Sequence, residues 1–528
     1  MNLCQASALE ALINATPDGG VCRLEEARYY LERRVVIRGK RNVTVEGGGA
    51  EIVTHYDNTA DFTADADAFL IENCHGLTLR DLDFDTDTPP NVTATLEAFD
   101  LAKNEVTLRV DDAFPMTGKE VLMTLASVDE EGSFDYRVHH YAKHPDPDIV
   151  TMIQDEILVA NTYAGADCQY LGDNRFRVWL SGRDYNPKQP QGRLKEARVG
   201  DRLCIRHTMY GPSTITIRHS DDTTLENLTM YATAGMGVMV LTRCHNLTID
   251  GLRMIRRGGV MMSCNCDGLH VTGLGGKLIL RNCEFDGLGD DALNIHSTAG
   301  TATVVDTENC RVKCNYCKKR PDGELPSAWC QRGDVVRFFD PQTLTCEGEL
   351  TVSDFTDGML TYSDVKGTLK EGYILQSMAF NASCEIENCT VRNTRARAFL
   401  FQCDNVEVKN CTFFGMSSCA IKAAPDIGYW YEVGPVDGLY IHHNRFIKNG
   451  FRDTISPTVA VHTSHNRAGW EAVFGMHKNV RVEDNVFERV PRCCVEMMAV
   501  DGVTLRNNTY PDGVIPTDLR NCRNVTEQ

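Results

Sequence analysis

A six-residue unit recurs along this chain, and it constrains the fold more than any other feature of the sequence. Each copy has an apolar residue, any residue, then Asn, Asp, Gly or His, then Leu, Cys or Asn, any residue, and a large apolar residue. The nine copies are LRDLDF (79–84), LENLTM (225–230), IDGLRM (249–254), LRNCEF (280–285), IENCTV (386–391), VKNCTF (408–413), IHHNRF (441–446), VEDNVF (482–487) and LRNNTY (505–510). Self-similarity of this kind is typical of a repeat architecture, in which each repeat stacks on the next.

Neighbouring copies are separated by about one turn of a β-solenoid. Measured between third positions, the separations are 24 residues from Asn227 to Gly251, 22 from Asn388 to Asn410 and 23 from Asp484 to Asn507. They lie within the range of about 20 to 45 residues for stacked repeats. The alternation of apolar residues is that of strands, so each unit is expected to form one strand and a corner of an all-β solenoid.

Coils of a solenoid stack about 4.8 Å apart, so equivalent residues of successive copies face each other. We expect Asn388 and Asn410 to stack as an asparagine ladder, and Cys389 and Cys411 to stack as a cysteine ladder in the core. The role of these residues is then structural. The same interpretation, buried small apolar side chains, fits most of the 22 cysteines.

Two long stretches interrupt the repeat. They lie between Phe84 and Leu225 and between Phe285 and Ile386, and they carry strand-like alternation of their own. Before the first copy, residues 6–15 have the apolar pattern of a helix, which suits a cap over the open end of a solenoid. The predicted segments are a cap with the first coils (1–90), a β-rich insertion (91–215), central coils (216–300), a second β-rich insertion (301–380) and C-terminal coils (381–528).

Charge and hydropathy exclude several classes of function. The formal net charge of −19 disfavours nucleic acid and anionic membranes as partners. No apolar run approaches the roughly 20 residues needed to span a bilayer. Residues 1–5 show no basic region leading into a long apolar stretch, so we expect no secretory signal and a cytoplasmic protein. The sequence leaves the oligomeric state open, and a homodimer is one of the states that it allows.

Three aspartates form the densest chemical signal. Asp267 lies 23 residues before Asp290, about one coil, and Asp291 follows directly. The spacing places Asp267 and Asp290 on neighbouring coils, and a bend at the corner would bring Asp291 into the same cleft. Carboxyls held close together repel, so one of them is expected to keep a proton near neutrality. That division suits glycoside hydrolysis, which needs an acid and an ionised partner. The alternatives are a solvated corner or a calcium ligand set.

Three further segments carry a family resemblance. GDDALNIH (289–296), NTRARAFLFQ (393–402) and DIGYWYEVGPVDGLYIHHNRF (426–446) together resemble glycoside hydrolase family 110, the α-1,3-galactosidases that include blood-group-B-cleaving enzymes. The resemblance runs from about Val35 to the C-terminus. It implies a right-handed, pectate-lyase-like parallel β-helix with inserted barrel-like regions, and an exo-acting, inverting enzyme that removes terminal α-linked galactose without a metal or other cofactor. The implied partner is a galactose-terminated oligosaccharide or glycoconjugate.

The same resemblance places the catalytic carboxylates on Asp267, Asp290 and Asp291. By analogy with the polygalacturonases, which have a similar layout, we favour Asp290 as the general acid and the other two as the base side. Inversion predicts acid and base carboxyls about 6.5 to 9.5 Å apart, which leaves room for a water molecule.

Eight further residues are candidates for recognising the sugar. Aromatic rings pack on the apolar face of galactose, while charged and amide groups bond to its hydroxyls. The alternatives are a core position for Trp430 and structural salt bridges for the arginines. His462 and His465 could line the cleft, but ordinary loop histidines are the favoured interpretation. The candidates are Trp430, Glu432, Asn294, His296, His270, Arg395, Arg397 and Asp426.

One cysteine set and two rival functions stay open. Cys310, Cys314, Cys317 and Cys330 have spacings that could hold a structural zinc ion, with reduced free thiols as the alternative. One rival is a non-catalytic carbohydrate-binding β-helix whose acidic corner binds calcium or sugar. The other is a polygalacturonase or polysaccharide lyase on the same fold, for which the acidic balance is unfavourable because a uronate needs a more basic cleft or a bound calcium ion.

Overall fold

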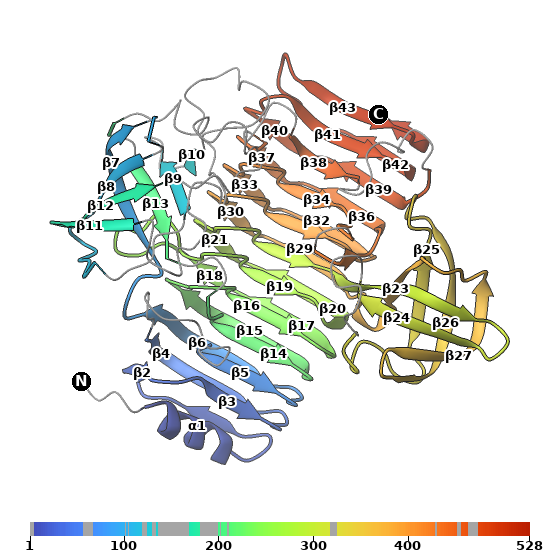
Figure 1. Cartoon of the computed structure of the whole chain (residues 1–528), viewed down its shortest axis with the longest axis horizontal. Helices are drawn as coiled ribbons and strands as arrows, with labels where there is room; N and C mark the ends of the chain where they lie inside the picture. Colours follow the sequence, from blue (N-terminus) through green and yellow to red (C-terminus); the bar gives the residue numbers. More distant parts are fainter. Residues whose placement is uncertain are drawn as a thin grey trace.

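The repeat folds into a parallel β-helix in the computed structural model of the chain (Figure 1). The description covers residues 5–55, 67–100, 102–103, 105–118, 124–128, 134–135, 168–179, 199–200, 202–207, 211–316, 325–427, 430–450, 456–462 and 474–528. Most coils contribute three strands, two to a large sheet that bends at a corner and one to a second sheet. The all-β fold class predicted from the repeat is confirmed.

The large sheet has 19 strands within the described residues, and its neighbouring coils pair in parallel. They are β1 (Val21–Arg23), β2 (Arg28–Leu31), β4 (Thr44–Thr54), β6 (Thr78–Thr86), β15 (Asp221–Met230), β17 (Cys244–Asp250), β18 (Arg253–Met254), β20 (Leu274–Arg281), β21 (Glu284–Asp286), β29 (Ser383–Glu387), β30 (Thr390–Arg392), β32 (Val406–Lys409), β33 (Thr412–Phe414), β36 (Asp437–His442), β37 (Arg445–Ile447), β39 (His477–Glu483), β40 (Val486–Glu488), β42 (Val500–Arg506) and β44 (Arg523–Glu527).

The second sheet has 11 strands in the same part of the chain and is also parallel. They are β3 (Val35–Arg38), β5 (Phe69–Glu72), β14 (Ile215–Arg218), β16 (Val238–Leu241), β19 (Leu269–Val271), β22 (Leu293–Ile295), β31 (Phe399–Phe401), β34 (Ile421–Ala423), β38 (Pro457–Val461), β41 (Cys493–Met498) and β43 (Ile515–Arg520).

The third position of the six-residue unit forms the corner of each coil. All nine third-position residues have a positive φ, between 50° and 73°. Glycine adopts this left-handed conformation freely, and Asn, Asp and His are the other residues that tolerate it best. The physical reason for the choice of residue at this position is therefore the backbone turn. The nine residues are Asp81, Asn227, Gly251, Asn282, Asn388, Asn410, His443, Asp484 and Asn507.

The fourth position points into the core and forms the ladder that runs through the solenoid. The predicted cysteine ladder is confirmed, since the Cys389 N–H donates to Cys411 Sγ at 3.4 Å. Asn388 and Asn410 lie at equivalent positions of successive coils, as predicted. On the exposed corner Asn388 Nδ2 donates to Asn282 Oδ1, whereas Asn410 Nδ2 donates to Glu387 Oε1. A buried asparagine ladder lies at the fourth position, because side chains there face inward. Along the chain the fourth positions are Leu82, Leu228, Leu252, Cys283, Cys389, Cys411, Asn444, Asn485 and Asn508.

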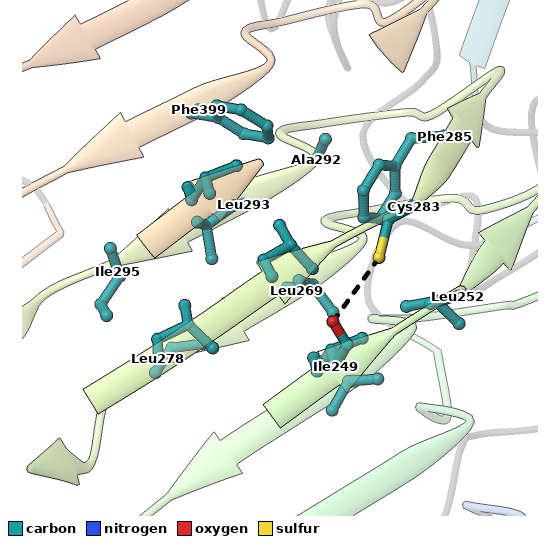
Figure 2. Close-up of a cluster of buried hydrophobic side chains, with 14 of the residues drawn as sticks. Ile249, Leu252, Leu269, Leu278, Cys283, Phe285, Ala292, Leu293, Ile295 and Phe399 are labelled. Atoms are coloured by element: carbon teal, nitrogen blue, oxygen red, sulfur yellow. Dashed lines mark hydrogen bonds between the residues drawn. The ribbon is translucent and has the colours of Figure 1, made fainter. Parts of the chain in front are cut away.

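One continuous apolar core fills the coils. Figure 2 shows Leu252, Cys283 and Phe285 pointing toward Leu269 and Leu293 of the second sheet. The sixth positions of the last coils stack face to face, with ring centroids 4.9 Å apart for Phe413 and Phe446. Each such pair adds about 0.5 to 1.5 kcal/mol beyond the area it buries.

Each interruption of the repeat folds into an antiparallel sheet beside the solenoid (Figure 1). In the second, pairing of β24 with β23 closes six strands into a barrel, and β35 extends it. The first sheet contains β7 (Asn91–Asp100), β8 (Glu105–Val110), β9 (Thr124–Val128), β10 (Phe134–Asp135), β11 (Cys168–Gly172), β12 (Arg175–Trp179) and β13 (Arg202–Arg206). The second contains β23 (Ser297–Asp306), β24 (Arg311–Tyr316), β25 (Val335–Phe339), β26 (Cys346–Thr356), β27 (Met359–Gly367), β28 (Ile374–Ser377) and β35 (Glu432–Val433), followed after β28 by the short 3₁₀ helix η3 (Met378–Phe380).

A single α-helix within the described residues, α1 (Ala6–Ala15), lies against the first coil at the N-terminal end (Figure 1). The helix predicted for residues 6–15 is confirmed, and its buried side chains Ala6, Leu9 and Ile13 join the solenoid core. In the part of the chain that the structure describes, no helix has the length and apolar character needed to cross a membrane.

Candidate active site

A cavity of about 360 Å³ opens on the outer face of the 11-stranded sheet. Its size falls within the range of about 300 to 1,000 Å³ that is usual for small-ligand pockets. The sheet supplies the floor, the corners before its strands supply one wall, and the segment after β34 supplies the opposite wall. The lining residues are Met236, Asp267, His270, Asp290, Asp291, Asn294, His296, Arg395, Ala396, Arg397, Leu400, Ser418, Lys422, Ala424, Asp426, Trp430 and Glu432.

The floor is one row of side chains in strict register. His270 of β19 pairs with Asn294 of β22, Asn294 with Leu400 of β31, and Leu400 with Lys422 of β34. Alternate residues of a strand point to opposite faces, so these four side chains lie outside the core while their neighbours fill it. The floor therefore follows directly from the stacking of four coils.

The acidic wall comes from the turns that precede these strands. The Asp291 N–H donates to Asp267 Oδ1 at 3.0 Å, and the Gly268 N–H donates to the Asp291 carbonyl at 2.8 Å. The coil step here is 24 residues, as in the pairing of Leu269 with Leu293. The in-register neighbour of Asp267 is therefore Asp291, while Asp290 lies one residue to the side, a correction to the 23-residue spacing inferred from the sequence.

Both oxygens of Asp267 are bonded within the site. Oδ1 accepts the Asp291 N–H, and Oδ2 lies 2.7 Å from His270 Nδ1. Burial raises the pKa of the Asp267 carboxyl, with the nearby Asp290 adding to the effect and His270 opposing it. For His270 burial alone would lower the pKa, but the bond to Asp267 and the surrounding carboxylates raise it. The contact therefore favours the ionised form of Asp267 and the protonated form of His270.

Two arginines from the next coil pair with the other aspartates. Arg397 binds Asp291 through two parallel bonds, Nε to Oδ1 at 2.8 Å and Nη2 to Oδ2 at 2.7 Å. Arg395 Nη2 lies 2.9 Å from Asp290 Oδ1. The exposed fraction of the side chain is 19% for Asp290, 7% for Asp267 and 1% for Asp291. Asp290 is thus the member of the cluster that most directly faces the cavity.

Three carboxyls with two arginine partners leave one negative charge to be balanced. Each carboxyl offers an oxygen within 4.8 Å of the others. Burial raises the pKa of Asp291 to about 7, with Asp290 and Asp267 adding to the rise and Arg397 opposing it. A proton held within the cluster near neutrality supplies the missing positive charge. Among the described residues these three are also the group whose spacing could hold a metal ion, but the arginines already provide much of the charge that an ion would bring.

The opposite wall is attached to the second inserted barrel. Glu432 of β35 pairs with Thr298 of β23, and its backbone also forms a two-way bridge with Asp426. Tyr431 between them has a φ of 61°, a conformation that a bulky residue rarely adopts. This turn leaves the Trp430 side chain 49% exposed at the rim while Glu432 is buried in the wall.

Glu432 is held as a carboxylate by amides and a histidine. Asn294 Nδ2 donates to Oε1 at 3.1 Å, and Gln402 Nε2 donates to Oε2 at 2.7 Å. Burial would raise the pKa of Glu432, but the neighbouring His296 and His270 together with these bonds lower it overall. Asn294 Oδ1 and His296 Nε2 are buried and have no hydrogen-bond partner in the described part of the chain, although Glu432 Oε1 lies 3.5 Å from the latter. Both residues line the cavity.

All eleven site residues predicted from the sequence line this cavity. Sequence reasoning missed six others, which are Met236, Ala396, Leu400, Ser418, Lys422 and Ala424. The signal for Lys422 was available, since it lies one 22-residue coil after Leu400. The step from Asn294 to Leu400, however, is hidden by the second insertion.

The remaining predicted residues lie elsewhere. His462 is buried 4.0 Å from Glu496 and is absent from the lining of the cavity, while His465 falls outside the described residues. Cys317 is also outside them, so the four-thiol zinc set remains a prediction. Cys314 and Cys330 are buried together in the core of the second barrel. The described cysteines form no group of three or more potential metal ligands.

The chain matches one family of β-helix proteins and several enzymes of known name. Residues 275–426 and 377–514 match the family described as right handed beta helix region. Alpha-1,3-galactosidase A of Bacteroides fragilis is 24% identical over 480 residues, which is 89% of this chain and 73% of the relative. Alpha-1,3-galactosidase B of Bacteroides thetaiotaomicron is 23% identical and covers 90% and 74%. This chain is similar in sequence to α-1,3-galactosidases over most of its length.

Two further proteins resemble this chain over part or most of its length. Alpha-1,3-galactosidase B of Akkermansia muciniphila is 27% identical over 67% of this chain and 45% of its own. Among solved structures, the A-module of the Azotobacter vinelandii mannuronan C-5 epimerase AlgE4 matches with a TM-score of 0.43 and 10% identity over 99% of this chain and 95% of its own. Such a distant likeness says nothing about the reaction. The relationship to the α-1,3-galactosidases and the right-handed sense of the helix, both predicted from the sequence motifs, are confirmed.

Proposed function

We propose that this relative of the α-1,3-galactosidases is itself an exo-acting glycoside hydrolase that removes terminal α-1,3-linked galactose from a glycan. The observation that carries the proposal is the acidic wall, where three aspartates from two neighbouring corners meet beside two arginines at one cavity. The names of the relatives supply the substrate class, and the small cavity suits a terminal sugar.

The differing environments of the aspartates support a division of roles. Asp290 is the most exposed of the three and is the proposed general acid, which protonates the oxygen of the leaving group. Asp267 and Asp291 are bonded to each other through the Asp291 N–H and form the proposed base side, which activates water. Burial raises the pKa of both Asp267 and Asp291, so the coupled cluster as a whole holds a proton near neutrality, and the proposed reaction starts from the form in which that proton is available to the leaving group.

Recognition of the sugar is assigned to the floor and the far wall. The exposed ring of Trp430 offers an apolar face for packing against galactose. Asn294 Oδ1 can accept a hydrogen bond from a sugar hydroxyl, and Glu432 is an ionised acceptor beside it. A buried acceptor that bonds only when the sugar is present favours the correct substrate, because leaving it unpaired costs about 1 to 3 kcal/mol.

Inversion is the proposed stereochemical course, on the strength of the family resemblance. The nearest oxygens of the three aspartates lie within 4.8 Å of one another, closer than the spacing of about 6.5 to 9.5 Å between acid and base in inverting enzymes. Every pair within this cluster falls below that spacing, so the separation by itself favours retention over inversion. The anomer that is released answers this question directly.

The first test is to incubate the protein with Gal-α-1,3-Gal and with a blood-group-B trisaccharide and to follow the released anomer by proton NMR. Early release of β-galactose supports inversion, and early release of α-galactose replaces it with retention. No release from either substrate, with binding still detectable, would favour a non-catalytic carbohydrate-binding β-helix. Cleavage of a polyuronate instead would favour a polygalacturonase or lyase.

A pair of variants assigns any activity to the acidic wall. Asp290→Asn removes the proposed acid and should lower the rate by about 10²- to 10⁴-fold, the usual contribution of a general acid. Asp222→Asn is the matched control, because Asp222 lies on an exposed left-handed corner and accepts a bond from Asn246 that an asparagine could also accept. Equal activity of both variants would remove Asp290 from the mechanism.

A further inference from the structure

The first inserted sheet contacts the solenoid through fully buried polar side chains. Asn91 begins β7 and Arg206 ends β13, and the two are paired opposite each other across that sheet. Neither side chain has any exposed surface. Asn265 of the solenoid, which both contact, is also completely buried. Polar groups this deeply buried are costly unless they are bonded, so the contact specifies one geometry.

The bonds converge on Asn265 from two sides. Asn91 Nδ2 donates to Asn265 Oδ1 at 2.9 Å, and Asn265 Nδ2 donates in return to the Pro90 carbonyl at 3.1 Å. Arg206 Nη1 donates to the Asn265 backbone carbonyl. Asn91 Nδ2 also reaches the Met262 carbonyl at 3.1 Å. The inserted sheet therefore fixes both the side chain and the backbone of Asn265.

Asn265 lies two residues before Asp267 and directly beside the next corner. A Cβ atom on Gly289 would lie 2.1 Å from the Asn265 carbonyl oxygen and 3.0 Å from Arg206 Nη1, so this close approach requires glycine. The Gly289 N–H donates to the Cys264 carbonyl at 2.8 Å, and the Asp290 N–H donates to the Cys266 carbonyl at 3.2 Å. Displacing Asn265 would therefore move both turns that carry the aspartates.

We propose that Asn91 and Arg206 are positioning residues, through which the first inserted sheet holds the two aspartate-bearing turns in the geometry that hydrolysis requires. Neither residue lines the cavity, so they act through Asn265 rather than on the sugar. The expected loss of kcat rests on the proposed function. The expected displacement of the two turns does not.

The kinetic test compares Asn91→Ala, Arg206→Gln and Arg206→Lys with the wild type on an α-galactoside. We expect kcat to fall by up to about 100-fold in the first two, the order of loss that a displacement of about 1 Å can cause, with KM changed by less than about threefold. Arg206→Lys keeps a donor for the Asn265 carbonyl and should recover part of the loss. Arg202→Gln is the matched control, because it removes an exposed ion pair with Asp111 from the same strand.

A purely structural role would lower the melting temperature and leave kcat unchanged in the folded protein. Wild-type kcat in Asn91→Ala and Arg206→Gln, measured well below their melting temperatures, would overturn the proposal. If Arg206→Gln fails to fold, Asn91→Ala decides, since it removes a neutral amide and leaves no buried charge unpaired.

Hydrogen exchange gives a second readout that needs no activity. In Asn91→Ala, amide exchange should accelerate in residues 262–268 and 287–292 and stay unchanged in the distant coils 480–506. Unchanged exchange in the two turns would overturn the proposal even if the enzyme is active. If the wild type releases no galactose, the proposed function fails while the exchange experiment still decides whether the inserted sheet holds these turns.

Discussion

Two rows of side chains run along the solenoid at the same spacing, and their compositions differ. The inward row in the large sheet, at the fourth position of the six-residue unit, passes from three leucines to three cysteines to three asparagines. The outward row on the 11-stranded sheet is mixed, and most of its adjacent members differ in chemical type. In register, that row is Thr216, Met239, His270, Asn294, Leu400, Lys422, Ala460, Glu496 and Asp518.

The difference shows that, within one coil, inward-facing residues stabilise the fold while outward-facing residues can form a binding site. In the inward row a residue is satisfied by its own kind one coil away, as when the Asn444 N–H donates to Asn485 Oδ1 at 2.9 Å. In the described part of the outward row no residue lies beside its own kind one coil away, so a polar group such as Asn294 depends on a neighbouring loop or on a ligand. A row of like residues therefore maintains the fold, and a row of unlike polar residues is where a site can form.

The largest expected effect of breaking the inward row is on stability. Asn485→Ala removes the acceptor for the Asn444 N–H and the donor to the Ile441 carbonyl, both buried. We expect a loss of about 3 kcal/mol in the free energy of unfolding, because buried groups left unpaired cost about 1 to 3 kcal/mol each. Urea unfolding measures it. Specific activity of the folded protein should change by less than about twofold, and a large change would mean that the inward row also shapes the site.

The same substitution in the outward row should act on the reaction instead. Asn294→Ala removes one bond to Glu432 and a buried acceptor that has no partner within the described residues. We expect kcat/KM to fall about 30-fold, equivalent to about 2 kcal/mol of transition-state stabilisation. The melting temperature should drop less than in Asn485→Ala, and the reverse order of the two melting temperatures would contradict the comparison.

The pH dependence tests whether the outward face carries the titrating cluster. Because the pKa of Asp291 is raised to about 7, the cluster keeps a proton below that pH and loses it above. We expect kcat/KM to decline above about pH 7 by roughly tenfold per unit, since the cluster has then lost the proton that the first step needs. A flat profile from pH 6 to 9 would contradict it.

The same raised pKa has a consequence for stability. The unfolded carboxyl ionises near its ordinary value of 3.8, whereas the folded one keeps its proton to about 7. The free energy of unfolding should therefore fall as pH rises from about 4 to about 7, by up to about 1.4 kcal/mol for each unit between the two pKa values. Asp291→Asn cannot titrate, so its stability relative to the wild type should rise over that interval.

The smallest effect is expected at the rim. Trp430→Ala removes the exposed ring that is proposed to pack on the sugar. We expect KM to rise about fivefold, about 1 kcal/mol, with kcat and melting temperature almost unchanged. Trp430→Phe keeps an apolar face and should restore most of the affinity. A fall in kcat without a change in KM would place the ring in the chemistry rather than in binding.

The sequence by itself determined the solenoid and most of the cavity. Corner residues such as Asn388 had to be compatible with a left-handed backbone, and the residues after them had to face the core, so the nine copies predicted the stacking of the coils that carry them. Because stacking brings residues one coil apart into contact, the convergence of Asp267 with the Asp290–Asp291 pair also followed from spacing.

Tertiary structure alone decided how the insertions complete the site. The in-register partner of Asp267 is Asp291, because the coil there has 24 residues, and the partner of Asn294 is Leu400, beyond a whole inserted barrel. Asn91 and Arg206 support Asn265 through individual polar contacts, and these contacts do not follow from the repeat pattern. A periodic sequence reveals the contacts between equivalent positions, because the same contact is repeated in every coil. An inserted sheet contacts the solenoid through residues that occur only once in the sequence. Such contacts can be recognised only in the folded chain.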